Sequence, residues 1–469
     1  MMNNATPLLS IASITFFMQS MDTTMLYLAI PTMAVSLHQS ILNMGILVGA
    51  YLLTVVMFTP VSGWLNDTFG YRQTYLLALA LFAAGSCLCA ASGSLFAISA
   101  SRVIQGIGGG LMLPAVRVGM LKSIAPRRKL AALNKMTLLG LLGTLAGPLV
   151  SGLLVMHFSW RLIFLINLPL CLACFFLARA HMPIKMRDSG DFDLRGFLLM
   201  TPAIILLMLG FYGMGRPGVP AVWIMASFAL ALLLVHLYRK YYITTPDPLF
   251  SWSLFRHRTF AIGIAGNIGV RIFLASVPLA LSLMLQLEFN YPPPAVSYIM
   301  LSFALGALLA RFLLRRILAR LGYRRLLLAT TGLTAAALYS LTCPLLTASL
   351  SLIALLIMVV GMLSSVLYAA MNTLTFSDLT DDTYNTGNSL LTLSQLLSVI
   401  ISVAFTFSSL RYLRDAGSLG GMDAYHALFS LMGLGLLLCC FIFLRLENND
   451  GDGFIQGVEK LPDPKQVIN

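Results

Sequence analysis

The stretch FFMQSMDTTMLYLAIP, residues 16–31, places one carboxylate, Asp22, in the middle of a long apolar run. Lipid cannot satisfy open backbone groups, so a run of about 20 apolar residues that crosses a hydrocarbon core must be helical. No other Asp or Glu of the chain lies comparably deep in an apolar run. Because a charge at bilayer depth costs several kcal/mol, an intramembrane acid is interpreted by default as functional.

Burial also suggests the chemistry of Asp22. A buried environment disfavours the ionised form, which makes proton uptake and release accessible to the carboxyl group. The alternative is an acid that is hydrogen-bonded to Thr23 or Thr24 and has only a packing role.

Similar apolar runs recur along the chain, which is 58% hydrophobic and only 10% charged. This composition lies outside the range of soluble proteins. The runs are continuous, whereas a β-barrel would show short alternating strands. We therefore predict an all-α polytopic membrane protein with 14 transmembrane helices, at residues 8–30, 43–65, 74–93, 95–120, 131–156, 160–180, 196–214, 221–239, 259–286, 294–318, 325–346, 349–371, 387–409 and 424–446.

The net charge of +13 follows membrane topology and does not indicate a nucleic-acid partner. If the connections alternate between two sides, Lys and Arg concentrate on the side that carries both termini. The other side holds only Arg161, Arg216, Arg411 and Arg414. This is the positive-inside pattern, so we predict that the N- and C-termini are cytoplasmic. Glu288, at an outer helix end, is expected to be solvated.

A short internal repeat suggests two related bundles. Gly70-Tyr71-Arg72 and Gly322-Tyr323-Arg324 each follow the second span of a predicted six-helix set. Chance similarity of a turn tripeptide is the alternative. If the repeat is real, the architecture is typical of transporters. The predicted domains are an N-terminal bundle (1–180), a linker with two inserted helices (181–258), a C-terminal bundle (259–446) and a cytoplasmic tail (447–469).

The loop GWLNDTFGYR, residues 63–72, joins two predicted spans. Gly63 is expected to allow close helix approach, Asp67 to cap the next helix or pair with a base, and Gly70 to turn the chain. An ordinary charged turn is the alternative. The loop resembles motif A of the major facilitator superfamily, which implies that Asp67 and Arg72 latch one conformation on the cytoplasmic side.

Arg102-Val-Ile-Gln105-Gly106-Ile-Gly108-Gly109-Gly110 lies within the fourth span and resembles motif B of the same superfamily. The resemblance implies that Arg102 takes part in proton coupling, with snorkelling to the surface as the alternative. The direction of each helix puts Asp22 about 12 Å and Arg102 about 10 Å below the same surface. We therefore predict that the two charges form a pair in a polar cavity.

The stretch GTLAGPLVSG, residues 143–152, combines small residues with a proline in the fifth span. It resembles motif C, which is associated with antiporters, and this implies that Gly143, Gly147, Pro148 and Gly152 let the helix bend or slide. Ser151 stands where the motif has a glycine. Generic packing of membrane helices is the alternative.

Two further elements are similar to signatures of the fourteen-helix drug:proton antiporters of this superfamily. They are MDTTMLYLAIP, residues 21–31, and WRLIFLINLP, residues 160–169. The departures are Met21 for the usual Leu and Tyr27 at a position where a small polar residue is common. The resemblance implies amphipathic drugs or toxic metabolites as cargo, protons as the coupling ion and the bacterial cytoplasmic membrane as the location.

Four polar residues are candidates to line the cargo cavity, namely Thr24, Gln105, Asn267 and Arg271. Asn267 and Arg271 are one helical turn apart, so they share a face in the second bundle. An interhelical contact without a ligand is an equal alternative for this pair. No His or Cys spacing indicates a metal, and no phosphate-binding glycine loop indicates ATP, so we predict no metal and no cofactor.

We therefore predict a proton-coupled efflux antiporter, without enzymatic activity, that works by alternating access and acts as a monomer. Asp22 would exchange the proton, with Arg102 as its partner. Asp67, Arg72 and the basic loop around Arg324 would form the cytoplasmic gate. Two alternatives stay open, namely a transporter of one defined metabolite and a membrane scaffold or sensor without transport.

Overall fold

The computed structural model describes residues 5–124, 126–182, 193–214, 218–245, 252–343, 349–379, 381–415, 419–447 and 450–451. Within these ranges every regular element is a helix and none is a strand, which confirms the all-α prediction for this part of the chain. The elements are α1 (Ala5–Ser36), η2 (Ile41–Asn43), α2 (Gly45–Phe58), α3 (Val61–Phe69), α4 (Tyr71–Ala91), α5 (Leu95–Ser123), α6 (Pro126–His157), α7 (Leu162–Leu165), α8 (Asn167–His181), α9 (Leu194–Gly213), α10 (Ala221–Thr244), η3 (Trp252–Arg256), α11 (Arg258–Leu274), α12 (Val277–Leu287), α13 (Pro293–Ser340), α15 (Leu350–Phe376), α16 (Asp381–Asp415) and α17 (Gly421–Phe443).

Twelve helical segments within the described ranges are long and apolar enough to cross a membrane. The other two predicted runs, 8–30 and 325–346, begin on α1 and on the part of α13 that follows Gly322. Helices therefore lie at the predicted apolar runs, with breaks inside the runs 43–65, 160–180 and 259–286.

Contacts divide the chain into two compact units. Unit 1 comprises Met1–Leu249, Pro278–Leu301 and Val403–Met422, and unit 2 comprises Phe250–Val277, Ser302–Ser402 and Asp423–Asn469. Two segments that the sequence assigns to the second bundle, Pro278–Leu301 and Val403–Met422, thus have most of their contacts in unit 1, and we call them the outlying segments.

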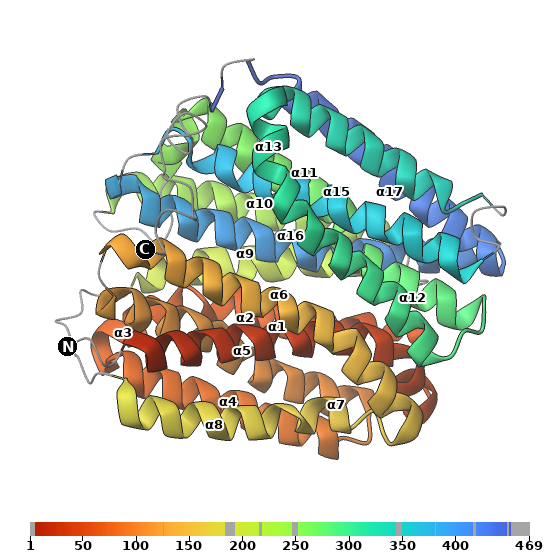
Figure 1. Ribbon diagram of the computed structural model, residues 1–469, viewed down its shortest axis with the longest axis horizontal. Coiled ribbons are helices and arrows are strands. Elements are labelled where there is room, and N and C mark those ends of the chain that lie inside the picture. Colours follow the sequence, from red (N-terminus) through yellow and green to blue (C-terminus); the bar gives the residue numbers. More distant parts are fainter. Residues whose placement is uncertain are drawn as a thin grey trace, which may run out of the picture. The chain divides into compact units, whose positions relative to one another are not determined.

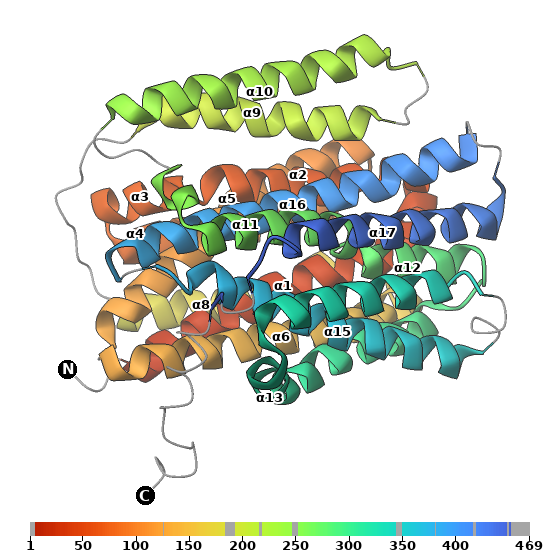
Figure 2. The same cartoon turned by 90° about the horizontal axis from the view of Figure 1, so that it is seen from above.

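Helix pairs build unit 1. α1 runs alongside α6, and α4 packs on α5, which also receives α2 (Figure 1). The inserted helices α9 and α10 lie against each other along their lengths, as Figure 2 shows. α1 also contacts α5 and α8, and this places the centre of α1 among helices that carry polar side chains.

Polar contacts tie the two outlying segments into unit 1. Gln286 donates to the carbonyl oxygen of Leu28 at 3.2 Å, and Arg411 donates to Asn43 Oδ1 at 2.9 Å. Glu288 forms an ion pair with Arg414. The expectation that Glu288 is simply solvated is therefore wrong, because α16 brings a guanidinium to its carboxylate.

The two repeated triplets have the same local geometry. Gly70 has φ 83° and ψ 153°, and Gly322 has φ 68° and ψ 171°. A positive φ of this kind is readily adopted only by glycine, so each glycine ends one helix sharply. The following Tyr71 and Tyr323 are both buried. This matching geometry supports the interpretation of the triplets as an internal repeat.

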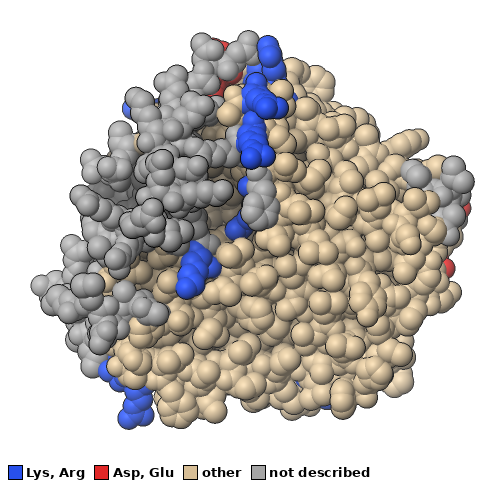
Figure 3. Space-filling model, viewed as in Figure 1, with Lys and Arg blue, Asp and Glu red and all other residues tan. Residues whose placement is uncertain are grey.

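The surface suits contact with lipid. Large apolar side chains such as Phe96, Val222 and Phe441 are more than half exposed. Figure 3 shows uncharged side chains over most of one face, with Lys and Arg gathered in a narrow band across it. Exposed apolar area of this kind is expected where hydrocarbon replaces water.

Candidate functional site

The Asp22 carboxylate lies at the centre of a buried polar network in unit 1. Its Oδ2 accepts a hydrogen bond from Arg102 Nη1 on α5 at 2.9 Å. Its Oδ1 accepts from Gln105 Nε2 at 3.0 Å and from Asn167 Nδ2 on α8 at 2.8 Å. Asp22 is 3% exposed and Arg102 is 1% exposed. The two charges that were predicted to share a depth are thus brought into direct contact.

The two threonines beside Asp22 do not bind it. Thr23 donates to the Gln19 carbonyl oxygen at 3.0 Å, and Thr24 donates to the Ser20 carbonyl oxygen at 3.0 Å. Both hydroxyls therefore bond to their own helix, and the hydrogen bond from Thr23 or Thr24 to Asp22 that the alternative requires is not formed. Thr24 lies at the α1–α6 contact and makes no hydrogen bond to the Asp22 network.

Arg102 is enclosed by protein groups on several sides. Its Nη1 also donates to Gln105 Oε1 at 2.6 Å, and its Nε donates to the Leu47 carbonyl oxygen at 3.3 Å. The guanidinium lies 4.4 Å from the ring centroid of Tyr51 and 5.7 Å from that of Phe164. Such contacts stabilise a cation away from water. Arg102 therefore does not snorkel to the surface.

Gln105 lies where the backbones of neighbouring helices come close to α5. Its Nε2 also donates to Ser86 Oγ on α4 at 3.0 Å. A Cβ at Gly85 would lie 2.5 Å from the Gln105 backbone nitrogen, and one at Gly106 would lie 2.7 Å from the Tyr51 carbonyl oxygen. No real side chain fits at such distances, so these glycines let α4 and α2 pack directly on α5.

The network depends on the balance between two buried opposite charges. The ionised Asp22 balances Arg102, and removing one member of a buried pair leaves an uncompensated charge. Protonation of Asp22 would therefore weaken its hold on Arg102. The guanidinium already contacts two neutral acceptors, Gln105 Oε1 and the Leu47 carbonyl oxygen, which could retain it.

The small residues of the fifth span face α1 directly. A Cβ at Gly147 would meet Thr24 Oγ1, and one at Gly143 would meet the Phe17 carbonyl oxygen. Ser151 donates to the Met25 carbonyl oxygen at 2.8 Å. Gly152 faces Ser297, which donates to the Pro148 carbonyl oxygen at 2.7 Å. The stretch 143–152 therefore packs against the helix that carries Asp22.

The stretch 63–72 was expected to be a loop, but residues 63–69 belong to α3 and only Gly70 separates α3 from α4. Two of its residues also depart from their expected roles. Nothing lies within 4 Å of a Cβ at Gly63, so its predicted role in close helix approach is wrong: it is on an exposed side of α3. Asp67 does not cap α4, because Gly70 occupies the N-cap without a side-chain hydrogen bond. Among the described residues, neither Asp67 nor Arg72 forms an ion pair. Gly70 turns the chain as predicted.

Unit 2 brings Asn267 and Arg271 together on α11. Arg271 Nε donates to Asn267 Oδ1 at 3.3 Å, and Asn267 Nδ2 donates to the Gly263 carbonyl oxygen at 3.0 Å. The guanidinium lies 4.1 Å from the ring centroid of Tyr368 on α15. Arg324 follows Gly322 at the break in α13, apart in sequence from this pair.

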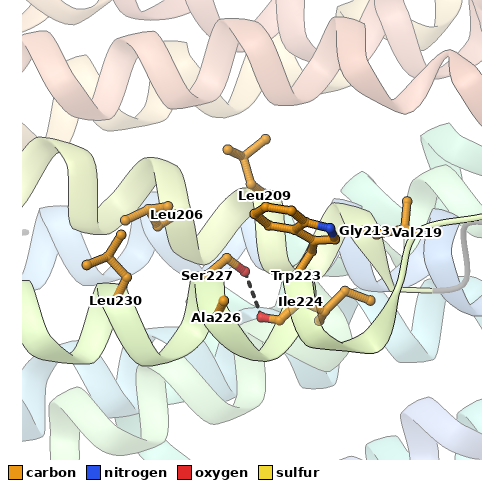
Figure 4. Close-up of a pocket in the computed structure, with 9 residues that line it drawn as sticks. All are labelled: Leu206, Leu209, Gly213, Val219, Trp223, Ile224, Ala226, Ser227 and Leu230. Carbon is orange, nitrogen blue, oxygen red and sulfur yellow. Dashed lines mark hydrogen bonds between the residues drawn. The ribbon is translucent and has the colours of Figure 1, made fainter.

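An open pocket with a volume of about 330 Å³ lies between α9 and α10 (Figure 4). Leu206, Leu209, Trp223 and Leu230 point into it, and no charged side chain lines it. Ser227 donates to the Ile224 carbonyl oxygen of its own helix, so its one hydroxyl proton is already used. This apolar pocket belongs to the inserted helix pair and not to the Asp22 network.

Two members of the network, Asn167 and Ser86, were not predicted from the sequence. Asn167 and Ser86 are both buried and polar within apolar spans, and such residues in a membrane helix generally have a partner. Asn167 stands in the WRLIFLINLP element that was used only for its resemblance. Its position alone could have marked it as a candidate.

Apolar helices long enough to span a bilayer, with a buried acid–arginine pair among them, define an integral membrane transporter. The family model for the Major Facilitator Superfamily matches residues 12–403 and, in a second match, 264–467. The chain belongs to this superfamily.

Relatives and solved structures agree with this assignment. MdtD of Escherichia coli (strain K12), named as a multidrug resistance protein, is 35% identical over 441 residues, covering 92% of this chain and 93% of MdtD. A peptide transporter POT in complex with sulfate has a TM-score of 0.67 at 17% identity, covering 95% of each chain. A D-xylose-proton symporter has a TM-score of 0.66 at 14% identity, covering 96% of this chain and 99% of the symporter. At these identities the two structures show the shared fold.

Proposed function

We propose that this protein is a proton-coupled exporter of small molecules, an antiporter that works by alternating access. The observation that carries the proposal is the buried contact between Asp22 and Arg102, completed by Gln105 and Asn167. Intramembrane acids held in this way belong to proton pathways of transporters. The 35% identity to MdtD supports the same conclusion and does not favour a scaffold.

The proton acts on the network as a switch. With Asp22 ionised, three N–H donors from α5 and α8 hold the carboxylate and tie α1 to both helices. With Asp22 protonated, one oxygen becomes a donor and the attraction to Arg102 falls, so α1 is released from one of its constraints. Because the 143–152 stretch of α6 packs on α1, movement of α1 is transmitted to α6.

The remaining organisation extends the proposal. We propose fourteen spans, arranged as two six-helix bundles with α9 and α10 inserted between them in sequence, and both termini in the cytoplasm of a bacterial cell. Gate roles are proposed for Asp67 and Arg72 in unit 1 and for Arg324 in unit 2. The protein would act as a monomer. The positive-inside distribution of Lys and Arg and the matching geometry of Gly70 and Gly322 support this scheme.

The cargo class is taken from the relatives. MdtD is named for resistance to several drugs, so we propose amphipathic drugs or toxic metabolites as cargo. Among the described residues of the Asp22 network, the polar groups bind one another closely, and the network therefore suits ion coupling better than it suits holding a bulky molecule.

Proteoliposomes with a trapped pH dye test the proposal. Addition of cargo to wild-type vesicles should move protons, and a pH gradient should drive cargo uphill. Asp22→Asn replaces the carboxylate with an amide of the same shape, which cannot exchange a proton at neutral pH. It should therefore abolish gradient-driven transport while leaving facilitated exchange of cargo. Uphill transport by Asp22→Asn at the wild-type rate would contradict the proposal.

A further inference from the structure

Arg102 on α5 and Arg271 on α11 both lie within helices, but the groups that surround the two guanidinium groups differ sharply. Arg102 has a carboxylate, an amide oxygen and a backbone carbonyl as acceptors. Arg271 has one acceptor, Asn267 Oδ1 at 3.3 Å, and no carboxylate among the described residues. Arg271 is partly buried, and a cation that is partly removed from water without a counter-charge is costly, so the second arrangement calls for an anion.

Arg271 is held in a fixed orientation. Asn267 Nδ2 is anchored to the Gly263 carbonyl oxygen at 3.0 Å, which turns its Oδ1 toward Arg271 Nε. The guanidinium lies over the Tyr368 ring, 4.1 Å from its centroid. The ring face stabilises the cation, but because it lies over the guanidinium plane it accepts no hydrogen bond from the N–H groups, which point outward in that plane. Nη1 and Nη2 make no hydrogen bond to the described residues.

Tyr368 on α15 also has a polar atom without a hydrogen-bond partner among the described residues. The hydroxyl oxygen of Tyr368 is buried and has no hydrogen-bond partner in the described part of the chain. Buried polar atoms without partners are rare in folded proteins and mark places where a partner is to be expected. Asn372 lies one turn further along α15 and accepts from Gln395 of α16 at 2.9 Å. Within unit 2, α11 and α15 therefore each bring a polar side chain, Asn267 and Tyr368, to Arg271.

We propose that Arg271 and Tyr368 form a binding site for an anionic group, a carboxylate or sulfonate, with Asn267 as the positioning residue. A planar guanidinium with both terminal nitrogens free matches two oxygens of such a group in a bidentate contact. The Tyr368 hydroxyl provides a further donor. If the proposed export function is correct, this group belongs to the cargo, and the protein selects amphipathic anions over cations.

Direct binding tests the site without any need for transport. The purified full-length protein in lipid nanodiscs is titrated with 1-naphthoate, with 1-naphthalenesulfonate and with the neutral 1-naphthamide, which carries the same ring. A charge-assisted bidentate contact should make the two anions bind at least about tenfold more tightly than the amide. Equal affinity for anions and amide, or no anion binding at millimolar concentrations, would overturn the proposal.

Variants assign the effect to Arg271. Arg271→Gln should remove the preference for anions, Arg271→Lys should keep part of it because the charge remains, and Tyr368→Phe should reduce it. The matched control is Arg311→Gln, which changes an exposed arginine of α13 in the same unit and should leave the preference intact. A loss in Arg271→Gln that is equal for naphthoate and naphthamide would indicate a packing role and would contradict the proposal.

The Asp22→Asn variant separates this inference from the export function. Anion binding at Arg271 should survive in Asp22→Asn, because Asp22 belongs to unit 1 whereas Arg271 and Tyr368 belong to unit 2. Anion binding without proton-coupled transport in the wild type would retain the site and reject the exporter. Proton-coupled transport restricted to cationic compounds would retain the exporter and reject the site.

Discussion

Asn167 on α8 donates from Nδ2 to Oδ1 of Asp22 on α1 at 2.8 Å, across 145 residues of sequence. The same carboxylate oxygen accepts from Gln105, and the other oxygen accepts from Arg102. The amide oxygen of Asn167 has no hydrogen-bond partner among the described residues, although it is buried. The asparagine therefore contributes to the network through its donor, which supports the Asp22 carboxylate.

Replacement of Asn167 should destabilise the protein through its effect on Asp22. Asn167→Leu removes a donor to the carboxylate, and a hydrogen bond to a charged group contributes about 1.5–3 kcal/mol. Because the buried carboxylate loses this support, the melting temperature in detergent should fall, and Asp22→Asn added to Asn167→Leu should recover part of the loss. The matched control is Asn66→Leu, a buried asparagine outside the network, in which adding Asp22→Asn should bring no recovery. Equal effects of Asp22→Asn in both backgrounds would show that the Asn167 donor does not act on Asp22.

Removal of Arg102 should destabilise the protein in a way that a second substitution at Asp22 reverses. Arg102→Gln leaves the buried Asp22 carboxylate without its counter-charge, at a cost of up to about 3–5 kcal/mol. The melting temperature in detergent should therefore fall below that of the wild type at neutral pH. Asp22→Asn combined with Arg102→Gln should melt above Arg102→Gln alone at neutral pH. Equal melting of the single and double variants would argue against a charge-based effect.

A side chain at Gly147 should separate α6 from α1. In Gly147→Ala the new Cβ meets Thr24 Oγ1 and the Met21 carbonyl oxygen, and overpacking of this kind costs about 1–3 kcal/mol. Thermal melting should show the loss, and adding Thr24→Ala should restore part of it. Gly332→Ala is the control, since a Cβ there meets nothing within 4 Å and alanine favours a helix. If both glycine variants melt alike, the α1–α6 contact is not tight.

Because Glu288 and Arg414 form an ion pair, substitutions at the two positions should have coupled effects on the stability of the protein. The side chains are only 17% and 31% exposed, so the pair is less screened than a surface pair, and we expect a coupling of about 1 kcal/mol. Glu288→Arg should lower the melting temperature, and the reversed pair Glu288→Arg with Arg414→Glu should recover it. The same reversal at Arg258 and Glu447, whose side chains are 46% and 70% exposed, should show weaker coupling. Stronger coupling at that exposed pair would reverse the expectation.

Helix positions and depth along each helix could be predicted from the chain. A residue's distance from the membrane surface follows from its count along an apolar run and a rise of about 1.5 Å per residue. For this reason Asp22 and Arg102 were expected at the same depth, and they form an ion pair. The turn at Gly70 was also predictable, since a glycine between two apolar runs marks a break.

The direction in which each residue faces could not be derived in the same way. In a membrane helix both the lipid-facing and the protein-facing positions are apolar, so the hydrophobic pattern does not report rotation about the axis. Packing alone turned Asn167 toward Asp22, left Gly63 facing open space and kept Arg271 away from any described carboxylate. Composition and spacing thus established a helical membrane protein with a deep acid and arginine, and the contacts between helices established which side chains bind one another.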